Sequence, residues 1–543
     1  MSRRTLAAAL LLFVTLAAWA VPARRVTRLL RLADGTQVRA TAMGDERFHY
    51  WQGEDGTRYV ALTDSTFTPL NAESHAVRAR RAAQRMKADN SRRRLRQRAN
   101  AAYTGNKRGI VILVNFQDKQ MVCGQDEFDR AFNLRGYSDY GSAGSVRDYF
   151  LAQSYGRLTV DFDVVGPFTL SRNMAYYGSN DRYGDDKHPA EMVIEAVKAA
   201  DPLVDFSRYD WDGDGEVDQV YVVYAGYGEA QSHINNTIWP HEWQLSYAKS
   251  NGDGTGALSV DGVRVDTYAC SNELYFGKAA QLDGIGIACH EFSHCLGLPD
   301  MYDTSGGYAS VYGMGSWDLM DGGSYNGDGY VPAAFTSYER WFAGWLTPVE
   351  ISAFTEVTGM QALTTVPQAY VIYNQANRNE YYLVENRQRQ GFDAQLPAAG
   401  MLVIHVDYDE QAWSDNEVNS VEGHERVTIV PADNNRSELQ ETGDTWPQLG
   451  HTALTNTSYP AATLYHANTD GQKLLNMPLR NITLVDGLIS FTAGDRPTGL
   501  RPLYDGSAGS TAPMLFDLQG RRATQDQRGV YIRNGRKVMK TQR

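Results

Sequence analysis

The chain has 543 residues and a formal net charge of −12 at neutral pH. That length exceeds what one hydrophobic core usually supports, so two or more folded units are expected. Residues 1–108 carry 21 Lys and Arg against 8 Asp and Glu, whereas residues 109–495 carry 21 against 53. Such an acidic body repels polyanions, which argues against nucleic-acid binding. We expect the basic N-terminal segment to rest on the acidic body instead.

The first residues have the pattern of a secretory signal. Two arginines precede an apolar run from residue 6 to 19, and residues 18–20 (Ala-Trp-Ala) fit a cleavage site. The run is short for a membrane anchor, and no later stretch has the length to span a bilayer. The chain is therefore predicted to be exported, with no integral membrane segment after signal removal.

An arginine-rich stretch, "SRRRLRQRAN", occupies residues 91–100. It has too little apolar content to pack and offers many trypsin-like cleavage sites. We interpret the segment from about residue 21 to this stretch as a cleavable pro-segment, the alternative being a solvated linker.

Downstream, local patterns predict both strands and helices. Residues 109–116 and 219–226 are apolar, β-branched runs typical of buried strands. Ser145 suits a helix N-cap, and Pro189 suits a first helical turn. After Trp345 the helical patterns stop and short strand-like runs recur, which predicts an all-β unit of sandwich type.

The acidic stretch "DWDGDGEVD" has the spacing of a calcium-binding loop. Asp210, Asp212, Asp214 and Asp218 stand at offsets 1, 3, 5 and 9, with Gly215 at the sharp turn. The twelfth position is a tyrosine rather than a glutamate, and the sequence predicts that a strand follows instead of a helix. We therefore predict an EF-like Ca²⁺ loop that braces the fold, with a metal-free acidic turn as the alternative.

The stretch "CHEFSHCLGLPD" carries the main chemical motif, within a helical spacing that ends at Gly297. His290 and His294 lie one turn apart on one face, so two imidazoles can reach one ion. Glu291 is placed to hold a water at the metal and to act as a base. Because Gly297 lets the backbone turn sharply, Asp300 can return as a third Zn²⁺ ligand, leaving the fourth position for water. A purely structural zinc would normally have four protein ligands.

Several motifs together resemble the immune inhibitor A family of secreted zinc metallopeptidases, relatives of the metzincins. The matching stretches are "SVRDYFLAQSYGRL" (145–158), "YDWDGDGEVD" (209–218), "IWPHEW" (238–243), "CHEFSHCLGLPDMYD" (289–303), "GSWDLMDGG" (315–323), and "ENRQ" with "GMLVIHVD" (385–407).

This resemblance implies a site and a fold. The implied Zn²⁺ ligands are His290, His294 and Asp300, with Glu291 as general base and Met320 in the turn beneath the metal. The usual metzincin pattern has a histidine where Asp300 stands. The implied fold class is α+β: a metzincin-like zinc peptidase domain with a mixed sheet, an active-site helix and a Met-turn, followed by an all-β sandwich-like domain.

Residues that stabilise the transition state are not fixed by these motifs. Many metzincins have a tyrosine two positions after the turn methionine, where this chain has Gly322. Tyr325 and His241 are the candidates, each with packing against the cleft wall as the alternative. Glu339 is a weaker candidate ligand that we expect to face solvent.

The four cysteines leave two possibilities. Cys289 and Cys295 are about 9 Å apart along a helix, beyond the roughly 7 Å limit for a bridge. Each either pairs with Cys123 or Cys270 or remains a free buried thiol.

The C-terminal stretch from residue 514 to 540 resembles the sorting segment of proteins exported by the type IX route. This resemblance implies interaction with secretion machinery and passage through the periplasm to the medium or the cell surface. An ordinary terminal hairpin is the alternative.

These observations predict a secreted zinc-dependent endopeptidase that acts on protein substrates and is made as a pro-form. The alternatives are a surface ligand-binding protein with a structural zinc site and a zinc hydrolase of non-peptide bonds. The predicted organisation is a signal peptide, a basic pro-segment, a catalytic domain, a β-sandwich-like domain and a sorting segment, at residues 1–20, 21–100, 101–346, 347–495 and 496–543.

Overall fold

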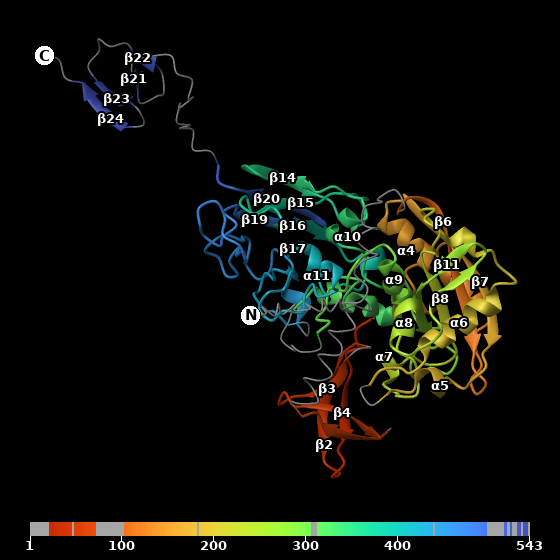
Figure 1. Ribbon diagram of the computed structural model, residues 1–543. Helices are drawn as coiled ribbons and strands as arrows, with labels where there is room; N and C mark the ends of the chain where they lie inside the picture. The colour runs from red at the N-terminus through yellow and green to blue at the C-terminus, as the bar shows by residue number, and fades with distance from the viewer. Residues whose placement is uncertain are drawn as a thin grey trace, which may run out of the picture. The chain divides into compact units, whose positions relative to one another are not determined.

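The computed structural model describes residues 21–45, 48–63, 65–71, 103–181, 184–305, 312–437, 440–496, 515–517, 522–523, 529–533 and 536–540. The predicted signal peptide and arginine-rich stretch lie outside these residues. The chain divides into two compact units, Met1–Ala493 and Gly494–Arg543 (Figure 1). The first unit contains an N-terminal sheet, an α/β region and a β-rich region.

The N-terminal sheet is antiparallel and packs against the α/β region. Its buried side chains include Leu30, Ala42 and Trp51, which share one apolar cluster with Trp239 and Ile287 of the α/β region. The described part of the basic N-terminal segment thus rests on the body that follows it, through apolar contacts. The strands, in sheet order, are β1 (Thr27–Arg31), β2 (Gln37–Gly44), β3 (His49–Gly53), β4 (Arg58–Thr63) and β5 (Thr66–Pro69).

The α/β region is built on a mixed five-stranded sheet with order β7-β6-β8-β12-β9, in which only β9 is antiparallel to its neighbour. The centre of β6 is buried on both faces, as expected for a parallel strand covered by helices. Val111 and Leu113 pack with α3 (Gln125–Asn133), α4 (Val146–Gln153) and α9 (Ile285–His294). Ile110 and Ile112 pack with α6 (Pro189–Ala200) on the other face. The strands are β6 (Gly105–Asn115), β7 (Leu158–Thr169), β8 (Val220–Tyr224), β9 (His241–Gln244) and β12 (Thr267–Asn272).

Helix positions in this region agree with the local sequence signals. Ser145 caps α4 through a reciprocal hydrogen-bond pair with Asp148, and Pro189 opens α6. The helices are α3 (Gln125–Asn133), α4 (Val146–Gln153), α5 (Met174–Gly178), α6 (Pro189–Ala200), α7 (Glu229–Ser232), α8 (Leu245–Ser250), α9 (Ile285–His294) and α10 (Ser337–Phe342). A hairpin of β10 (Leu258–Val260) and β11 (Val263–Val265) completes the region.

The β-rich region contains two sheets, with orders β13-β15-β16-β17-β18 and β14-β20-β19. Side chains of both sheets, among them Val384 and Phe491, share one apolar cluster. The opposite face of the larger sheet, with Leu383 and Ile404, joins the same cluster as the α9 side chains. The core therefore continues across residue 347. The elements are β13 (Val349–Glu350), β14 (Thr355–Met360), β15 (Tyr370–Tyr373), β16 (Glu380–Arg387), β17 (Gly400–Asp407), α11 (Glu410–Ser414), β18 (Val427–Ile429), β19 (Leu479–Val485) and β20 (Leu488–Ala493).

The second unit contains a small antiparallel sheet with order β22-β21-β23-β24. Its strands are β21 (Leu515–Phe516), β22 (Arg522–Ala523), β23 (Gly529–Arg533) and β24 (Arg536–Lys540).

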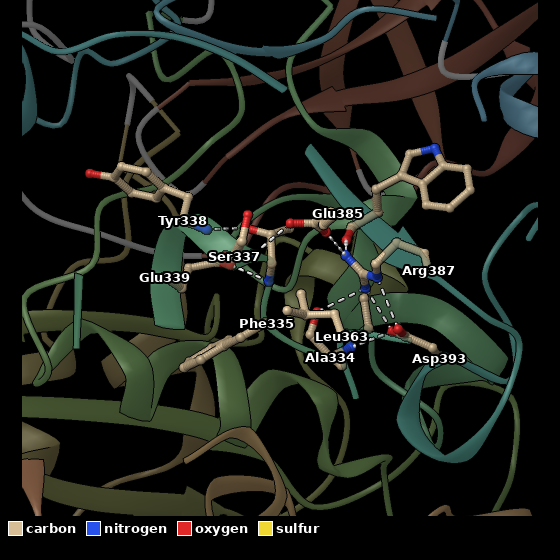
Figure 2. Close-up of polar contacts among 12 residues, drawn as sticks. Ala334, Phe335, Ser337, Tyr338, Glu339, Leu363, Glu385, Arg387 and Asp393 are labelled. Atoms are coloured by element: carbon tan, nitrogen blue, oxygen red, sulfur yellow. Dashed lines mark hydrogen bonds and ion pairs between the residues drawn. The ribbon is translucent and has the colours of Figure 1, made fainter. Parts of the chain in front are cut away.

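A buried arginine joins the β-rich region to the α/β region (Figure 2). Arg387 donates to Asp393 through Nε (2.9 Å) and Nη2 (2.6 Å), and to Glu385 through Nη1 (3.2 Å). Its other bonds go to the carbonyl oxygens of Trp317 (3.1 Å) and Ala334 (3.0 Å). Burial lowers the pKa of Arg387, but the two carboxylates outweigh that effect and raise it overall. All five guanidinium donors are therefore satisfied in a dry interface.

We expect Arg387→Met to lower the free energy of unfolding by about 3–5 kcal/mol, because it leaves a buried carboxylate without its partner. Urea unfolding followed by tryptophan fluorescence measures this loss. Arg389→Met is the matched control, because Arg389 is exposed and donates to a single carbonyl oxygen. Equal losses in the two variants would contradict this account of the interface.

Candidate metal centre

Helix α9 is buried along its whole length and lies directly against the 3₁₀ segment η5 (Gly322–Gly329). A Cβ atom at Gly286 would lie 1.9 Å from the carbonyl oxygen of Ser324, and one at Gly284 would lie 2.3 Å from the Gly329 backbone. Glycine is therefore required at both positions. Gly297 has φ +86° and ends the helical path in the left-handed conformation, as predicted.

Three ligand atoms converge at the end of this helix. His290 Nε2 and His294 Nε2 are 3.2 Å apart, and Asp300 Oδ1 lies 3.2 Å from the first and 3.6 Å from the second. All three side chains are buried. Tetrahedral zinc with bonds of about 2.0–2.1 Å separates neighbouring ligand atoms by roughly 3.3 Å. The donor set and its spacing therefore fit a zinc ion.

Hydrogen bonds behind the imidazoles fix which nitrogen of each ring faces inward. His290 Nδ1 lies 2.8 Å from the carbonyl oxygen of Leu319, and His294 Nδ1 lies 2.8 Å from that of Leu298. Because a carbonyl oxygen only accepts, each Nδ1 carries the proton. Both Nε2 lone pairs are then directed at the same point, the arrangement that protein metal sites use.

Asp300 is oriented by a residue of the β-rich region. Asn416 Nδ2 donates to Asp300 Oδ2 (2.6 Å), and the Asp300 N–H donates to Asn416 Oδ1 (2.8 Å). Asn416 is fully buried and has φ +53°, a left-handed conformation that asparagine tolerates better than most residues. Sequence reasoning missed this residue, because 116 positions separate the pair and no motif marks it.

Met320 lies in a turn directly after Leu319, whose carbonyl oxygen contacts His290. Its N–H donates to Asp318 Oδ1 (2.7 Å), and its carbonyl oxygen accepts from the Met301 N–H (2.8 Å). Burial, followed by the neighbouring Glu339, raises the pKa of Asp318. Glu339 is fully buried and caps α10 by accepting from the Thr336 N–H (2.5 Å), and it also accepts from the Thr336 hydroxyl (2.6 Å). The expectation that Glu339 faces solvent was therefore wrong.

N-terminal residues occupy the space in front of Glu291. The Val21 N–H donates to Glu291 Oε1 (3.1 Å), and both residues are fully buried. Trp239 Nε1 donates to the carbonyl oxygen of Val21 (3.1 Å), and the Tyr325 hydroxyl donates to that of Pro22 (2.8 Å). Tyr325 thus binds a main-chain carbonyl beside the candidate base.

His241 lies in β9, where Nδ1 is 2.7 Å from the Trp239 carbonyl oxygen and Nε2 is 3.0 Å from the Tyr268 hydroxyl. Burial lowers the pKa of His241 to about 4, so the ring is neutral at neutral pH. Both ring nitrogens of His241 thus have hydrogen-bond partners.

The acidic loop at 210–218 brings Asp210, Asp212 and Asp214 together, with one carboxylate oxygen of each within 4.8 Å of the others. Asp218 is buried and accepts from the Trp211 N–H (2.6 Å). Strand β8 follows the loop, as expected.

The four cysteines are buried free thiols. The structure therefore supports the free-thiol alternative and not the two bridges.

Among the described residues, no helix is long and apolar enough to cross a bilayer.

Residues 101–346 match the immune inhibitor A peptidase M6 catalytic domain. This segment belongs to that family. It is similar to "Immune inhibitor A" of Bacillus thuringiensis subsp. alesti, at 28% identity over 245 residues, covering 38% of this chain and 34% of the relative. It is also similar to "Pre-pro-metalloprotease PrtV" of Vibrio cholerae serotype O1, at 29% identity over 246 residues, covering 39% of this chain and 25% of the relative. The match thus spans about a third or less of these relatives.

Two carboxyl groups lie against the segment that precedes the Met320 turn. Asp444 Oδ2 accepts from the Tyr312 hydroxyl and from Trp317 Nε1, both at 2.7 Å, and Glu441 Oε1 accepts from the Ser316 N–H (2.8 Å). Burial raises the pKa of Asp444 and that of Glu441 to about 7. Both groups therefore favour the protonated form in the folded chain below about pH 7.

This placement predicts a pH-dependent effect of Asp444→Asn on stability. Because the folded pKa is raised, proton binding by Asp444 stabilises the fold fully below about pH 4, and this contribution is lost as the pH rises through about 7. The amide cannot ionise, so the variant should gain stability relative to wild type between pH 5 and pH 8. Urea unfolding at both pH values measures the difference, with the exposed Glu410→Gln as control. A difference that does not change with pH would contradict the prediction.

Proposed function

We propose that the chain is a secreted zinc-dependent endopeptidase that hydrolyses peptide bonds in proteins and is made as a latent pro-form. The observation that carries the proposal is the convergence of His290 Nε2, His294 Nε2 and Asp300 Oδ1, with Glu291 directly following the first ligand in helix α9. These residues lie in a segment of a peptidase family, which supports proteins as substrates.

In this mechanism His290, His294 and Asp300 hold the zinc. Bound zinc supplies a Lewis acid that polarises the peptide carbonyl and lowers the pKa of water to about 7. Glu291 accepts a proton from the attacking water and passes it from Oε1 to the leaving nitrogen. The contact between the Val21 N–H and Oε1 supports this step, because it shows that a main-chain nitrogen reaches that oxygen. Tyr325 binds a main-chain carbonyl of the substrate, and His241 has no part in the mechanism.

The contact between the Val21 N–H and Glu291 Oε1 also accounts for the proposed latency. Residues 21–24 lie against Glu291, Trp239 and Tyr325, which line the proposed cleft, and the sheet β1–β5 that they lead into packs on the α/β region. Removal of the signal after Ala20 would turn the Val21 amide into a positively charged α-amino group, which pairs more strongly with a carboxylate. We propose that cleavage within the arginine-rich stretch weakens the attachment of this segment and opens the cleft.

Two further assignments remain proposals. The cluster of Asp210, Asp212 and Asp214 is a candidate Ca²⁺ loop that braces the strand β8. The small sheet of the second unit is the candidate sorting segment for the secretion machinery, which would deliver the chain to the medium or the cell surface.

The test of the proposed function compares wild type with Glu291→Gln. Each full chain is folded, nicked with trypsin in the arginine-rich stretch, and assayed on an unfolded protein, with zinc measured in the same samples. We expect Glu291→Gln to retain zinc and to lose at least about 100-fold in activity, the usual contribution of a general base. Glu410→Gln, which removes an exposed carboxylate, should match wild type.

Equal cleavage by wild type and Glu291→Gln would remove Glu291 from the mechanism. A zinc-loaded wild type that cleaves no peptide bond would favour a bracing zinc site or a hydrolase of other bonds instead.

A further inference from the structure

Residues 21–24 contact the proposed cleft in chain order, beginning with Val21 at Glu291. The Val21 nitrogen touches Glu291 Oε1, the atom that passes a proton to the leaving nitrogen in the proposed mechanism. Val21 therefore takes the place of the first residue after the cleaved bond. Trp239 and Tyr325 bind the next two carbonyl oxygens in order, those of Val21 and Pro22.

Arg24, three residues after Val21, is held by the cleft through both its main chain and its side chain. Its N–H donates to the carbonyl oxygen of Ala230 (3.1 Å), and its guanidinium pairs with Asp328 and lies 5.0 Å from the ring centre of Tyr275. The Arg24 side chain is 22% exposed. Burial lowers the pKa of Arg24, but Tyr275 and Asp328 outweigh that effect and raise it. The cleft thus stabilises a cation at this position.

One partner of Arg24 belongs to a segment that packs closely on the helix of the metal centre. Asp328 lies in η5, which also carries Tyr325 and packs on α9 through the glycine contacts described above. Its φ of +60° is unusual for a residue with a side chain, and the glycines on either side of it also have positive φ. The Asp328 side chain is 61% exposed. Backbone packing between η5 and α9 therefore links Asp328 to the helix that carries two of the candidate metal ligands.

We propose that Asp328 and Tyr275 form a subsite for a cationic side chain, Arg or Lys, at the fourth residue after the scissile bond of the substrate. This inference rests on the proposed function and adds a substrate class to it. In the latent chain Arg24 fills the subsite, so the pro-segment imitates the C-terminal half of a preferred substrate.

Fluorogenic peptides that differ at one position test the subsite. Their N-terminal half comes from the site that the nicked wild type cleaves best in an unfolded protein, and their C-terminal half is Val-Pro-Ala-Arg, Val-Pro-Ala-Gln or Val-Pro-Ala-Glu. For wild type we expect kcat/KM to favour Arg over Gln by about three- to tenfold, as a partly exposed ion pair with a cation–π contact implies.

Variants of the subsite should change this preference. Asp328→Asn should reduce the Arg preference below about twofold, and Asp328→Lys should reverse it in favour of Glu. The matched control is Asp486→Asn, because Asp486 is exposed in the turn between β19 and β20 and has φ +50°, which asparagine accepts. This control should keep the wild-type preference.

The outcomes separate the two proposals. Cleavage of all three peptides at equal rates by wild type would overturn the subsite and leave the endopeptidase intact. A preference for Arg that persists in Asp328→Asn would also overturn it. If Arg24→Gln makes the unnicked chain active while the peptides show no preference, the Arg24 contacts serve latency alone, and the subsite is again overturned. Cleavage of none of the peptides would count against the proposed function itself.

Discussion

The structure depends on holding two imidazole nitrogens and a carboxylate oxygen within 3.2–3.6 Å of one another in a buried site. Polar atoms brought so close without water are costly unless a cation and outer hydrogen bonds compensate them. The outer bonds are present: carbonyl oxygens of Leu319 and Leu298 orient the rings, and Asn416 orients Asp300. The glycine contacts of α9 and the turn at Met320 also help to bring these three ligand atoms together.

The β-rich region is part of this support and not a separate attachment. It supplies Asn416 to the candidate ligand Asp300, and Arg387 to the carbonyl oxygen of Trp317 just before the Met320 turn. Asp444 accepts from the indole of the same tryptophan. Because the apolar core also runs through both regions, the geometry of the metal centre and the stability of the β-rich region are coupled.

Local sequence signals predicted the parts of the site that one helix positions. The four-residue spacing of His290 and His294, and the glycine that ends α9, are determined within a few turns of chain. The buried strands and the caps at Ser145 and Pro189 were predictable for the same reason. Asn416, the burial of Glu339 and the N-terminal strands were not predicted, because each depends on contacts between distant segments. The cysteine pairing also depends on such contacts, and spacing left it open.

The most direct test of the account is crystallography of the full chain with anomalous diffraction recorded at the zinc edge. The account predicts one zinc ion between His290 Nε2, His294 Nε2 and Asp300 Oδ1, with bonds of about 2.0–2.2 Å. Zinc bound only elsewhere, or imidazole rings turned away from one another in zinc-saturated crystals, would contradict it.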